Sequence, residues 1–338
     1  MAGSKKGSQK GSTKAGARPA AGPGPGPGPG ATRAPGYSLS VDDERELPRT
    51  QVGYPPQHLL LTVLGDYGPP AGVMVPSGAL VSILAEFAVT TAGARAAIGR
   101  LARRGLLVPS KSGRNTAYSM TPQCAELVEE GRYLTYRFTG SVEQWDGRWT
   151  MVAYSINEAQ RALRPLLRTR LRWLGFAPLQ DGLWVSPDPP GPALDQVLAE
   201  VPPTQCAVFV GDPVAGRRRQ WPLEAWDLAT TRKAYDAFVR EFEPKRARLE
   251  RGAIAPAEAL VSRTKLVYRW FQVANDHAQL PAELLPANWP GARARALFCD
   301  LVDDLGPLAA ARVAHHVGKF APAVATQIKA LTMDDVLA

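Results

Sequence analysis

The sequence predicts a multidomain α+β fold, and three observations along the chain support this prediction. The segment 89–120 carries a helical pattern followed directly by the pattern of a β-hairpin. Short aromatic and β-branched runs alternate with helical stretches between residues 149 and 210. Long amphipathic patterns fill the chain from Trp226 onward. We therefore expect an N-terminal winged helix-turn-helix, a central ferredoxin-like domain and a helical C-terminal domain.

The length of 338 residues and the hydrophobic fraction of 45% allow two or three domains with packed cores. Changes of composition and pattern along the chain suggest where these domains begin and end. We expect a disordered low-complexity tail at 1–50, a winged helix-turn-helix with a connector helix at 55–140, a ferredoxin-like domain at 145–225, a helical C-terminal domain at 226–320 and a second tail at 321–338.

The N-terminal residues differ in composition from the rest of the chain. They are rich in glycine, serine, alanine and lysine, and Gly22–Gly30 has the sequence GPGPGPGPG. Such a segment cannot bury enough apolar surface to offset its ordering entropy. The first 36 residues also hold six basic and no acidic side chains, so they supply +6 of the net charge of +9. Basic character in the rest of the chain is therefore local, as a nucleic-acid-binding module requires.

Cysteine usage and hydropathy favour a cytoplasmic protein. The three cysteines, Cys124, Cys206 and Cys299, are far apart and form no C-x-x-C pair, so neither a disulfide framework nor a zinc site is indicated. No apolar run approaches the ~18 residues of a membrane-spanning helix. The basic start of the chain lacks the apolar core of a secretory signal.

Two apolar helices are expected ahead of the basic segment. The first is His58–Tyr67, with the sequence HLLLTVLGDY. The second is Ser77–Phe87, for which we expect Ser77 to be the N-cap. A helical spacing places four of its side chains on one side, namely Leu80, Ile83, Leu84 and Phe87.

A third helix is predicted to begin at Thr90 or Thr91, since either side chain can cap it. The i, i+3, i+4, i+7 spacing puts Ala94, Ala97, Ile98 and Leu101 on one inward face. Gly105 should end this helix, because glycine takes the left-handed C-cap conformation at little cost. Leu106–Ser110 and Thr116–Met120 then form a β-hairpin around the turn Ser112–Asn115.

The segment 89–120 contains six basic residues and no acidic residue. One interpretation is that the helix enters a DNA major groove while the hairpin turn reaches a phosphate or the minor groove. The other is that the basic side chains form an ordinary solvated surface. The candidate DNA-binding residues are Thr90, Thr91, Ala92, Arg95, Gly99, Arg100, Arg103, Arg104, Lys111 and Arg114.

The central region combines strands with an arginine-rich helix. We expect strands at Trp149–Ile156, Leu183–Ser186 and Cys206–Val210, and helices at Glu158–Leu174 and Ala193–Glu200, with a kink or later start of the longer helix at Pro165. Arginines on that helix can hold an anionic ligand such as a coenzyme A ester, or they can simply form its exposed face. The candidate ligand-binding residues are Arg164, Arg168, Arg172, Trp173 and Trp184.

Further helices are expected around and after these regions. One connector helix runs from Gln123 to about Arg137, with Pro122 at its first position. The C-terminal region should contain helices at Trp226–Arg251, Pro256–Phe271 and Ala292–Leu305.

Signatures of catalysis are missing from the sequence. It contains no G-x-S-x-G, no phosphate-binding lysine loop, no G-x-G-x-x-G after a strand and no H-E-x-x-H. The aspartates Asp300, Asp303 and Asp304 fall on one helix, where a solvated acidic face is expected. We therefore predict a binding protein, not an enzyme, with no catalytic residue, no metal site and no bound cofactor.

Several long runs of the sequence resemble the PaaX family of bacterial transcriptional regulators. The similarity covers Gln57 to Leu305 in the same order. The runs are HLLLTVLGDYGPP, TTAGARAAIGRLARRGLLVPSKSGRNTAYSMTPQ, WDGRWTMVAYSI, LRTRLRWLGFAPLQDGLWVSP, LPAELLPANWPG and ARALF.

The resemblance implies a homodimer that binds a double-stranded DNA operator and represses an aromatic-acid catabolic operon. An aryl-CoA thioester, phenylacetyl-CoA in the type case, is expected to be the effector that releases it. By position, Thr91, Ala92, Arg95 and Gly99 correspond to the exposed face of the recognition helix, and Arg114 to the tip of the wing. FQVANDHAQL at Phe271–Leu280 departs from the family's more aromatic pattern.

The sequence leaves two other functions open beside this one. The central domain implied by the resemblance is similar to a small CRISPR-associated nuclease subunit, in which an aspartate ends the first strand. Ser155 stands at that place here, which argues against a metal-dependent nuclease. A protein-interaction scaffold built on the C-terminal helices is the third possibility, and it would show no salt-dependent affinity for DNA.

Overall fold

The computed structural model of the chain describes residues 54–68, 71–113, 115–136, 145–212, 222–276 and 280–337. The predicted disordered tail and Arg114 lie outside these residues.

The first described region consists of three helices and a small antiparallel sheet. The helices are α1 (Pro56–Tyr67), α2 (Ser77–Ala85) and α3 (Thr91–Arg103), and the strands are β1 (Val75–Pro76), β2 (Leu107–Ser112) and β3 (Asn115–Met120). The strand order is β1-β3-β2. The predicted helices and the hairpin are thus present, with ends that differ by a few residues. Helix α4 (Pro122–Tyr136) follows β3 directly, and Thr121 Oγ1 accepts a hydrogen bond of 3.0 Å from Cys124 N at its start.

The ends of α3 follow the predicted chemistry, whereas the start of α2 does not. Thr90 Oγ1 accepts a hydrogen bond of 3.1 Å from Gly93 N, and Gly105 has φ +71 after the last turn of α3. The prediction that Ser77 caps α2 is wrong, because Pro76 occupies the N-cap position and Ser77 is already helical. Val75 and Pro76 pair with β3, so the backbone stays extended until Ser77.

The central region has the topology of a split β-α-β fold. It contains β4 (Trp149–Ser155), α5 (Leu163–Trp173), β5 (Ala177–Gln180), β6 (Leu183–Ser186), α6 (Pro192–Glu200) and β7 (Gln205–Gly211). The sheet order is β5-β6-β4-β7 with antiparallel neighbours, as in a ferredoxin-like domain. A short 3₁₀ turn (Glu158–Gln160) precedes α5, so the predicted later start near Pro165 is confirmed. Strand β5 was not predicted.

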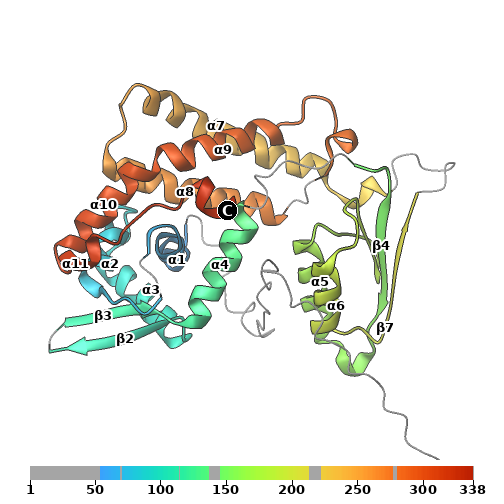
Figure 1. Cartoon of the computed structure of the whole chain (residues 1–338), viewed down its shortest axis with the longest axis horizontal. Coiled ribbons are helices and arrows are strands. Elements are labelled where there is room, and N and C mark those ends of the chain that lie inside the picture. Colours follow the sequence, from blue (N-terminus) through green and yellow to red (C-terminus); the bar gives the residue numbers. More distant parts are fainter. Residues whose placement is uncertain are drawn as a thin grey trace, which may run out of the picture. The chain divides into compact units, whose positions relative to one another are not determined.

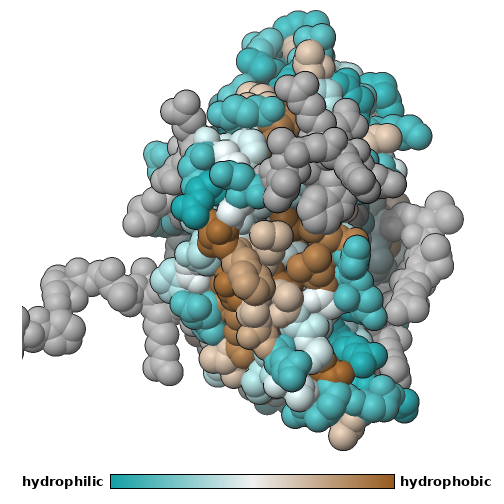
Figure 2. All heavy atoms as spheres, turned by 90° about the vertical axis from the view of Figure 1, so that its right-hand side faces the viewer, coloured by the Kyte–Doolittle hydropathy of each residue, from teal (hydrophilic) through white to brown (hydrophobic). Residues whose placement is uncertain are grey.

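The two faces of this sheet differ in their covering. Helices α5 and α6 lie on one face (Figure 1), where Val152, Leu167 and Trp184 form a buried cluster. Strand β7 is at one edge, and Val208, Phe209 and Val210 on it are 39%, 55% and 37% exposed. Figure 2 views the molecule from the side of Figure 1 on which β7 lies, and it shows apolar side chains gathered there.

The C-terminal region is helical throughout. It contains α7 (Leu228–Glu250), α8 (Pro256–Asp276), α9 (Gly291–Asp304), α10 (Gly306–Gly318), α11 (Pro322–Ala325) and α12 (Met333–Leu337). Residues 321–338, expected to form a tail, include α11 and α12. Met333 is buried, and Leu331 N donates a hydrogen bond of 3.0 Å to Asp66 O of α1.

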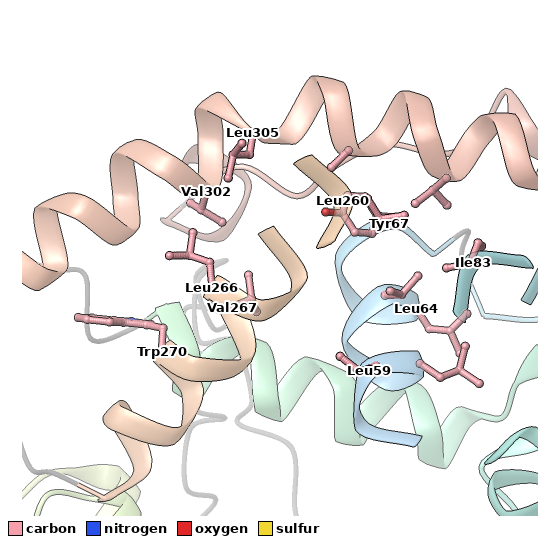
Figure 3. Packing of buried hydrophobic residues seen from close by; sticks show 14 of the residues in the cluster. Leu59, Leu64, Tyr67, Ile83, Leu260, Leu266, Val267, Trp270, Val302 and Leu305 are labelled. Carbon is pink, nitrogen blue, oxygen red and sulfur yellow. The ribbon is translucent and has the colours of Figure 1, made fainter. Parts of the chain in front are cut away.

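One hydrophobic core joins the N-terminal helices to the C-terminal helices. Leu59, Leu64 and Ile83 belong to the same buried cluster as Leu260 and Val302 (Figure 3). The sequence suggested one domain at 55–140 and another at 226–320. In the structure α8 packs against α1, α4 and α10, so the two regions form one helical body. The central sheet has a separate core.

Candidate nucleic-acid interface

Helix α3 has one buried face and one exposed face. Ala94, Ala97, Ile98 and Leu101 are at most 2% exposed, as their helical spacing predicted. The opposite face carries four of the predicted DNA-binding residues, with Thr91, Ala92 and Arg95 exposed and Gly99 partly exposed. Thr90, the cap, is also exposed at the start of the helix. The structure therefore brings these predicted residues to one accessible surface.

The arginines near the end of α3 differ in how exposed their side chains are. Arg100 and Arg103 are exposed, and Arg100 Nε donates a hydrogen bond of 2.9 Å to Gln57 Oε1 of α1. Within the described part of the chain, no salt bridge joins Arg95, Arg100 or Arg103 to a carboxylate. Arg104 is only partly exposed and lies close enough to His58 to help lower its pKa, although burial is the larger cause.

The hairpin extends the basic surface beyond α3. Lys111 is exposed on β2 and pairs across the hairpin with Thr116. Gly113 has φ +60 in the connecting turn, a conformation that glycine adopts without the strain of a side chain. Arg114, predicted at the tip, lies outside the described residues.

An ion cluster at the end of α2 links this helix to α10. Glu86 Oε1 accepts hydrogen bonds from Arg312 Nε at 2.7 Å and from His316 Nε2 at 2.7 Å. Arg312 and His316 belong to α10, and Glu86 is the C-cap of α2. No local sequence pattern predicts this cluster, because its partners are 226 and 230 residues apart.

The predicted ligand-binding residues of the central region do not form one open site. Arg164 donates a hydrogen bond of 2.9 Å to Ile156 O, and Arg168 is paired with Asp181 at 2.5 Å. Arg172 is exposed, with its guanidinium 5.5 Å from the centre of the Trp184 ring. Trp184 is 2% exposed in the core of the sheet, so it cannot line an accessible pocket. Trp173 is partly buried, with the guanidinium of Arg170 5.1 Å from the centre of its ring, and it lines a cavity together with residues of α1, α4 and α8.

The end of β4 carries a serine where an aspartate is expected in nuclease relatives. Ser155 is the last residue of that strand and is exposed. Among the residues that the structure describes, no three histidine, cysteine, aspartate or glutamate side chains come together as metal ligands would. The helices described here include none with the length and apolarity needed to cross a membrane.

Three family models match successive parts of the chain. A model described as PaaX-like protein matches residues 56–124, the model of the PaaX protein central Cas2-like domain matches 142–221, and the model of the PaaX-like protein C-terminal domain matches 226–315. Their order follows the first helices and hairpin, the central sheet and the C-terminal helices.

Two known proteins are similar over most of their length. The transcriptional repressor PaaX of Escherichia coli K12 is 27% identical over 270 residues, which cover 75% of this chain and 82% of the repressor. The solved structure of the uncharacterised protein Rv0674 from Mycobacterium tuberculosis is 21% identical with a TM-score of 0.49, covering 76% of this chain and 96% of that one. From the three successive family models and the similarity to the Escherichia coli repressor, we conclude that this chain belongs to the PaaX family.

Proposed function

We propose that this protein is a sequence-specific DNA-binding transcriptional regulator that acts as a repressor. The exposed face of α3 carries the proposal: Arg95, Arg100 and Arg103 are exposed there, and none of them has a carboxylate partner among the described residues. The similarity to a transcriptional repressor supports the same function. We assign the central domain no catalytic role, since Ser155 replaces the aspartate expected of nuclease relatives.

In this proposal, α1, α2, α3 and the β2–β3 hairpin act as a winged helix-turn-helix, with α3 as the recognition helix. Arg95, near the start of α3, reads a base edge in the major groove. Arg100, Arg103 and Lys111 contact phosphates on either side. A helix presented by its N-terminal residues fits this geometry, because those residues reach deepest into the groove.

The test is to measure the affinity of Arg95→Ala for a DNA site selected by the wild-type chain from a random-sequence library. A bidentate contact between arginine and guanine contributes about 1–3 kcal/mol, so affinity should fall roughly 5- to 150-fold and preference at one base pair should relax. Arg251→Ala, which removes an exposed arginine after α7, is the matched control and should bind as the wild type does. Unchanged affinity and preference in Arg95→Ala would overturn the role of α3.

The salt dependence of binding separates a DNA regulator from a protein scaffold. Each neutralised phosphate releases condensed counterions, so the logarithm of the affinity should fall steeply and linearly with the logarithm of salt concentration. Lys111→Ala should reduce that slope by about one phosphate contact without changing base preference.

We further propose that the regulator is a homodimer that uses the edge strand β7. An exposed edge strand can pair antiparallel with its copy about a two-fold axis, and Phe209 with its neighbours supplies apolar area at that edge. Light scattering should show a dimer that Phe209→Lys converts to a monomer. Phe320→Lys, at a phenylalanine of similar exposure in a different region, should leave the dimer intact.

An aryl-CoA thioester, phenylacetyl-CoA in the first instance, is proposed as the effector that releases the protein from an operator of an aromatic-acid catabolic operon. Gel-shift experiments with the selected DNA site and a panel of acyl-CoA esters test this. Phenylacetyl-CoA should release the DNA at a concentration where free coenzyme A does not.

A further inference from the structure

The turn between α2 and α3 contains a residue in an unusual backbone conformation. Ala88 has φ 59, in the left-handed region that glycine enters freely and that residues with a Cβ atom rarely adopt. Ala88 N donates a hydrogen bond of 3.0 Å to Ala85 O. Val89 N donates one of 3.3 Å to Leu84 O. Together these bonds form a Schellman motif, in which glycine is the usual residue at the position of Ala88.

The end of α3 shows the same motif with the usual residue. Gly105 has φ +71 there, and the equivalent hydrogen bonds run from Gly105 N to Ala102 O and from Leu106 N to Leu101 O, both at 3.0 Å. For alanine the left-handed conformation is disfavoured roughly 5- to 30-fold relative to glycine. Contacts from elsewhere in the structure are therefore needed to hold the α2–α3 turn in its observed conformation.

Such contacts come from α10, which packs against α2 (Figure 1). Glu86, two residues before Ala88, accepts hydrogen bonds from Nε and Nη2 of Arg312 and from Nε2 of His316. Arg312 and His316 are four residues apart on α10, so both side chains lie on one face and reach the same carboxylate. Glu86, Arg312 and His316 are called the Glu86 cluster below.

The Glu86 cluster supplies an ionic link to a helix with little charge of its own. Glu86 is the only charged residue within residues 77–94. Its side chain is 15% exposed and that of His316 is 7% exposed, so solvent and salt screen this link less than an ion pair on the open surface. At the start of α2, a Cβ atom placed on Gly78 would lie only 2.5 Å from the ring of Phe320, which follows α10. Contacts from α10 and Phe320 thus reach both ends of α2.

We infer that the Glu86 cluster is a positioning device for DNA recognition. It holds the turn at Ala88 in the left-handed conformation and so fixes α3 relative to α2. The inference rests on the proposed function, in which these two helices form the helix-turn-helix. When the turn leaves this conformation, fewer molecules present Arg95 in the binding geometry, and the affinity for DNA falls in proportion to the lost fraction. The C-terminal region thereby controls the DNA-binding helices.

Glu86→Ala is the decisive variant, because electrostatics and positioning predict opposite effects on DNA affinity. Glu86 is the acidic residue nearest to α3 in the sequence, so removing its charge makes the DNA-binding region more positive. Electrostatics alone therefore predicts tighter binding. The positioning role predicts that binding weakens roughly threefold or more, up to the 5- to 30-fold by which alanine disfavours the turn.

Ala88→Gly supplies the rescue. Glycine adopts the left-handed conformation without strain, so the turn then depends less on the Glu86 cluster. Ala88→Gly alone should bind DNA as the wild type does. Added to Glu86→Ala, it should restore most of the lost affinity, and this non-additivity is the signature of a shared turn. A glycine cannot replace a lost contact with DNA, so the rescue separates positioning from direct binding.

Glu258→Ala is the matched control. Glu258 of α8 also has two cationic partners, Lys245 at 2.7 Å and Arg248, but both belong to α7. Glu258→Ala should lower the unfolding temperature and leave the DNA affinity unchanged. Fluorescence anisotropy with the full chain and the selected DNA site measures each affinity, at a temperature well below the unfolding of every variant.

Hydrogen exchange of the full chain without DNA examines the turn directly. Exchange in peptides that span residues 84–91 should be faster in Glu86→Ala than in the wild type and in Glu258→Ala. Adding Ala88→Gly should slow it again, because the hydrogen bonds of the turn then re-form.

Two results would overturn the inference. They are a loss of DNA affinity in Glu86→Ala of less than about threefold, and a loss that Ala88→Gly does not reverse. A chain that binds no DNA in any form refutes the proposed regulator instead. Faster exchange of the turn in Glu86→Ala would then still support the role of the Glu86 cluster in holding the turn, whereas unchanged exchange would refute that role as well.

Discussion

At the scale of single residues, burial and hydrogen bonding have opposite effects on the pKa of the Glu86 carboxyl. Burial alone would raise the pKa of the Glu86 carboxyl, but hydrogen bonds from His316 and Arg312 hold it below its usual value. Burial lowers the pKa of His316, and the charge of Arg312 acts in the same direction. The cluster therefore keeps an ionised glutamate against a neutral histidine near pH 7.

This balance predicts how stability depends on pH. Because burial holds the pKa of folded His316 below the ordinary value for histidine, the unfolded chain binds a proton at a higher pH than the folded chain does. The free energy of unfolding should therefore fall as the pH drops through about 6.5, the ordinary pKa of histidine. His58 contributes with the same sign, since its pKa is also lowered by burial.

Urea titrations at pH values from 7.5 to 5.5 check this prediction. His316→Gln keeps a donor for Glu86 but cannot titrate, so its free energy of unfolding should fall less over this range. His315→Gln changes the exposed neighbour and should follow the wild-type curve. A His316→Gln curve parallel to that of the wild type would contradict the assigned pKa shift.

At the scale of elements, local patterns predicted α3 and its hairpin well because each signal there is local. The buried stripe from Ala94 to Leu101, the cap at Thr90 and the left-handed Gly105 all depend on residues within a few positions of one another. The start of α2 and the strand β5 were missed for the opposite reason. Pairing of Val75 and Pro76 with β3 displaced the expected cap, and β5 is short, with Pro178 in it and a register shift against β6.

Two glycines of this element should respond to alanine with opposite signs. Gly105 has φ +71, which costs a residue with a Cβ atom roughly 1–2 kcal/mol. Gly99 lies inside α3, where an added Cβ atom meets only the end of the Arg103 side chain at 3.9 Å. Gly105→Ala should therefore lower the free energy of unfolding by about 1 kcal/mol or more, and Gly99→Ala should raise it by up to about 1 kcal/mol. Chemical denaturation measures both, and stabilisation by Gly105→Ala would contradict the cap geometry.

At the scale of the whole molecule, the shared core of the N-terminal and C-terminal helices could not be predicted from sequence. Helical spacing shows which face of α1 or α8 is apolar, but not that the two faces meet. The candidate site shows the same division: the exposed face of α3 followed from its periodicity, whereas the cluster at Glu86 joins residues that are 226 and 230 positions apart. The arginines of α5 did not indicate a ligand site correctly, because Arg164 and Arg168 have partners within their own domain.

Arg263, which is fully buried, links distant segments of this shared core. Its Nη1 donates a hydrogen bond of 2.8 Å to Asp66 Oδ2 of α1, and its Nε donates one of 2.8 Å to Val302 O of α9. Arg263 also bonds Leu331 O near the C-terminus. One side chain thus ties three distant segments together. Removing it leaves the Asp66 carboxylate buried without its ion-pair partner.

Arg263→Met should lower the free energy of unfolding of the helical body by about 3–5 kcal/mol, the usual cost of breaking a buried ion pair from one side. Adding Asp66→Asn to this variant should recover part of the lost free energy of unfolding, because the buried carboxylate charge of Asp66 is then removed. Hydrogen exchange read by mass spectrometry locates the effect. Protection should fall in peptides from α1, α8 and α9 but not in β4 and β6, whose core is separate. An equal loss of protection in β4 and β6 would mean that the two cores unfold as one unit.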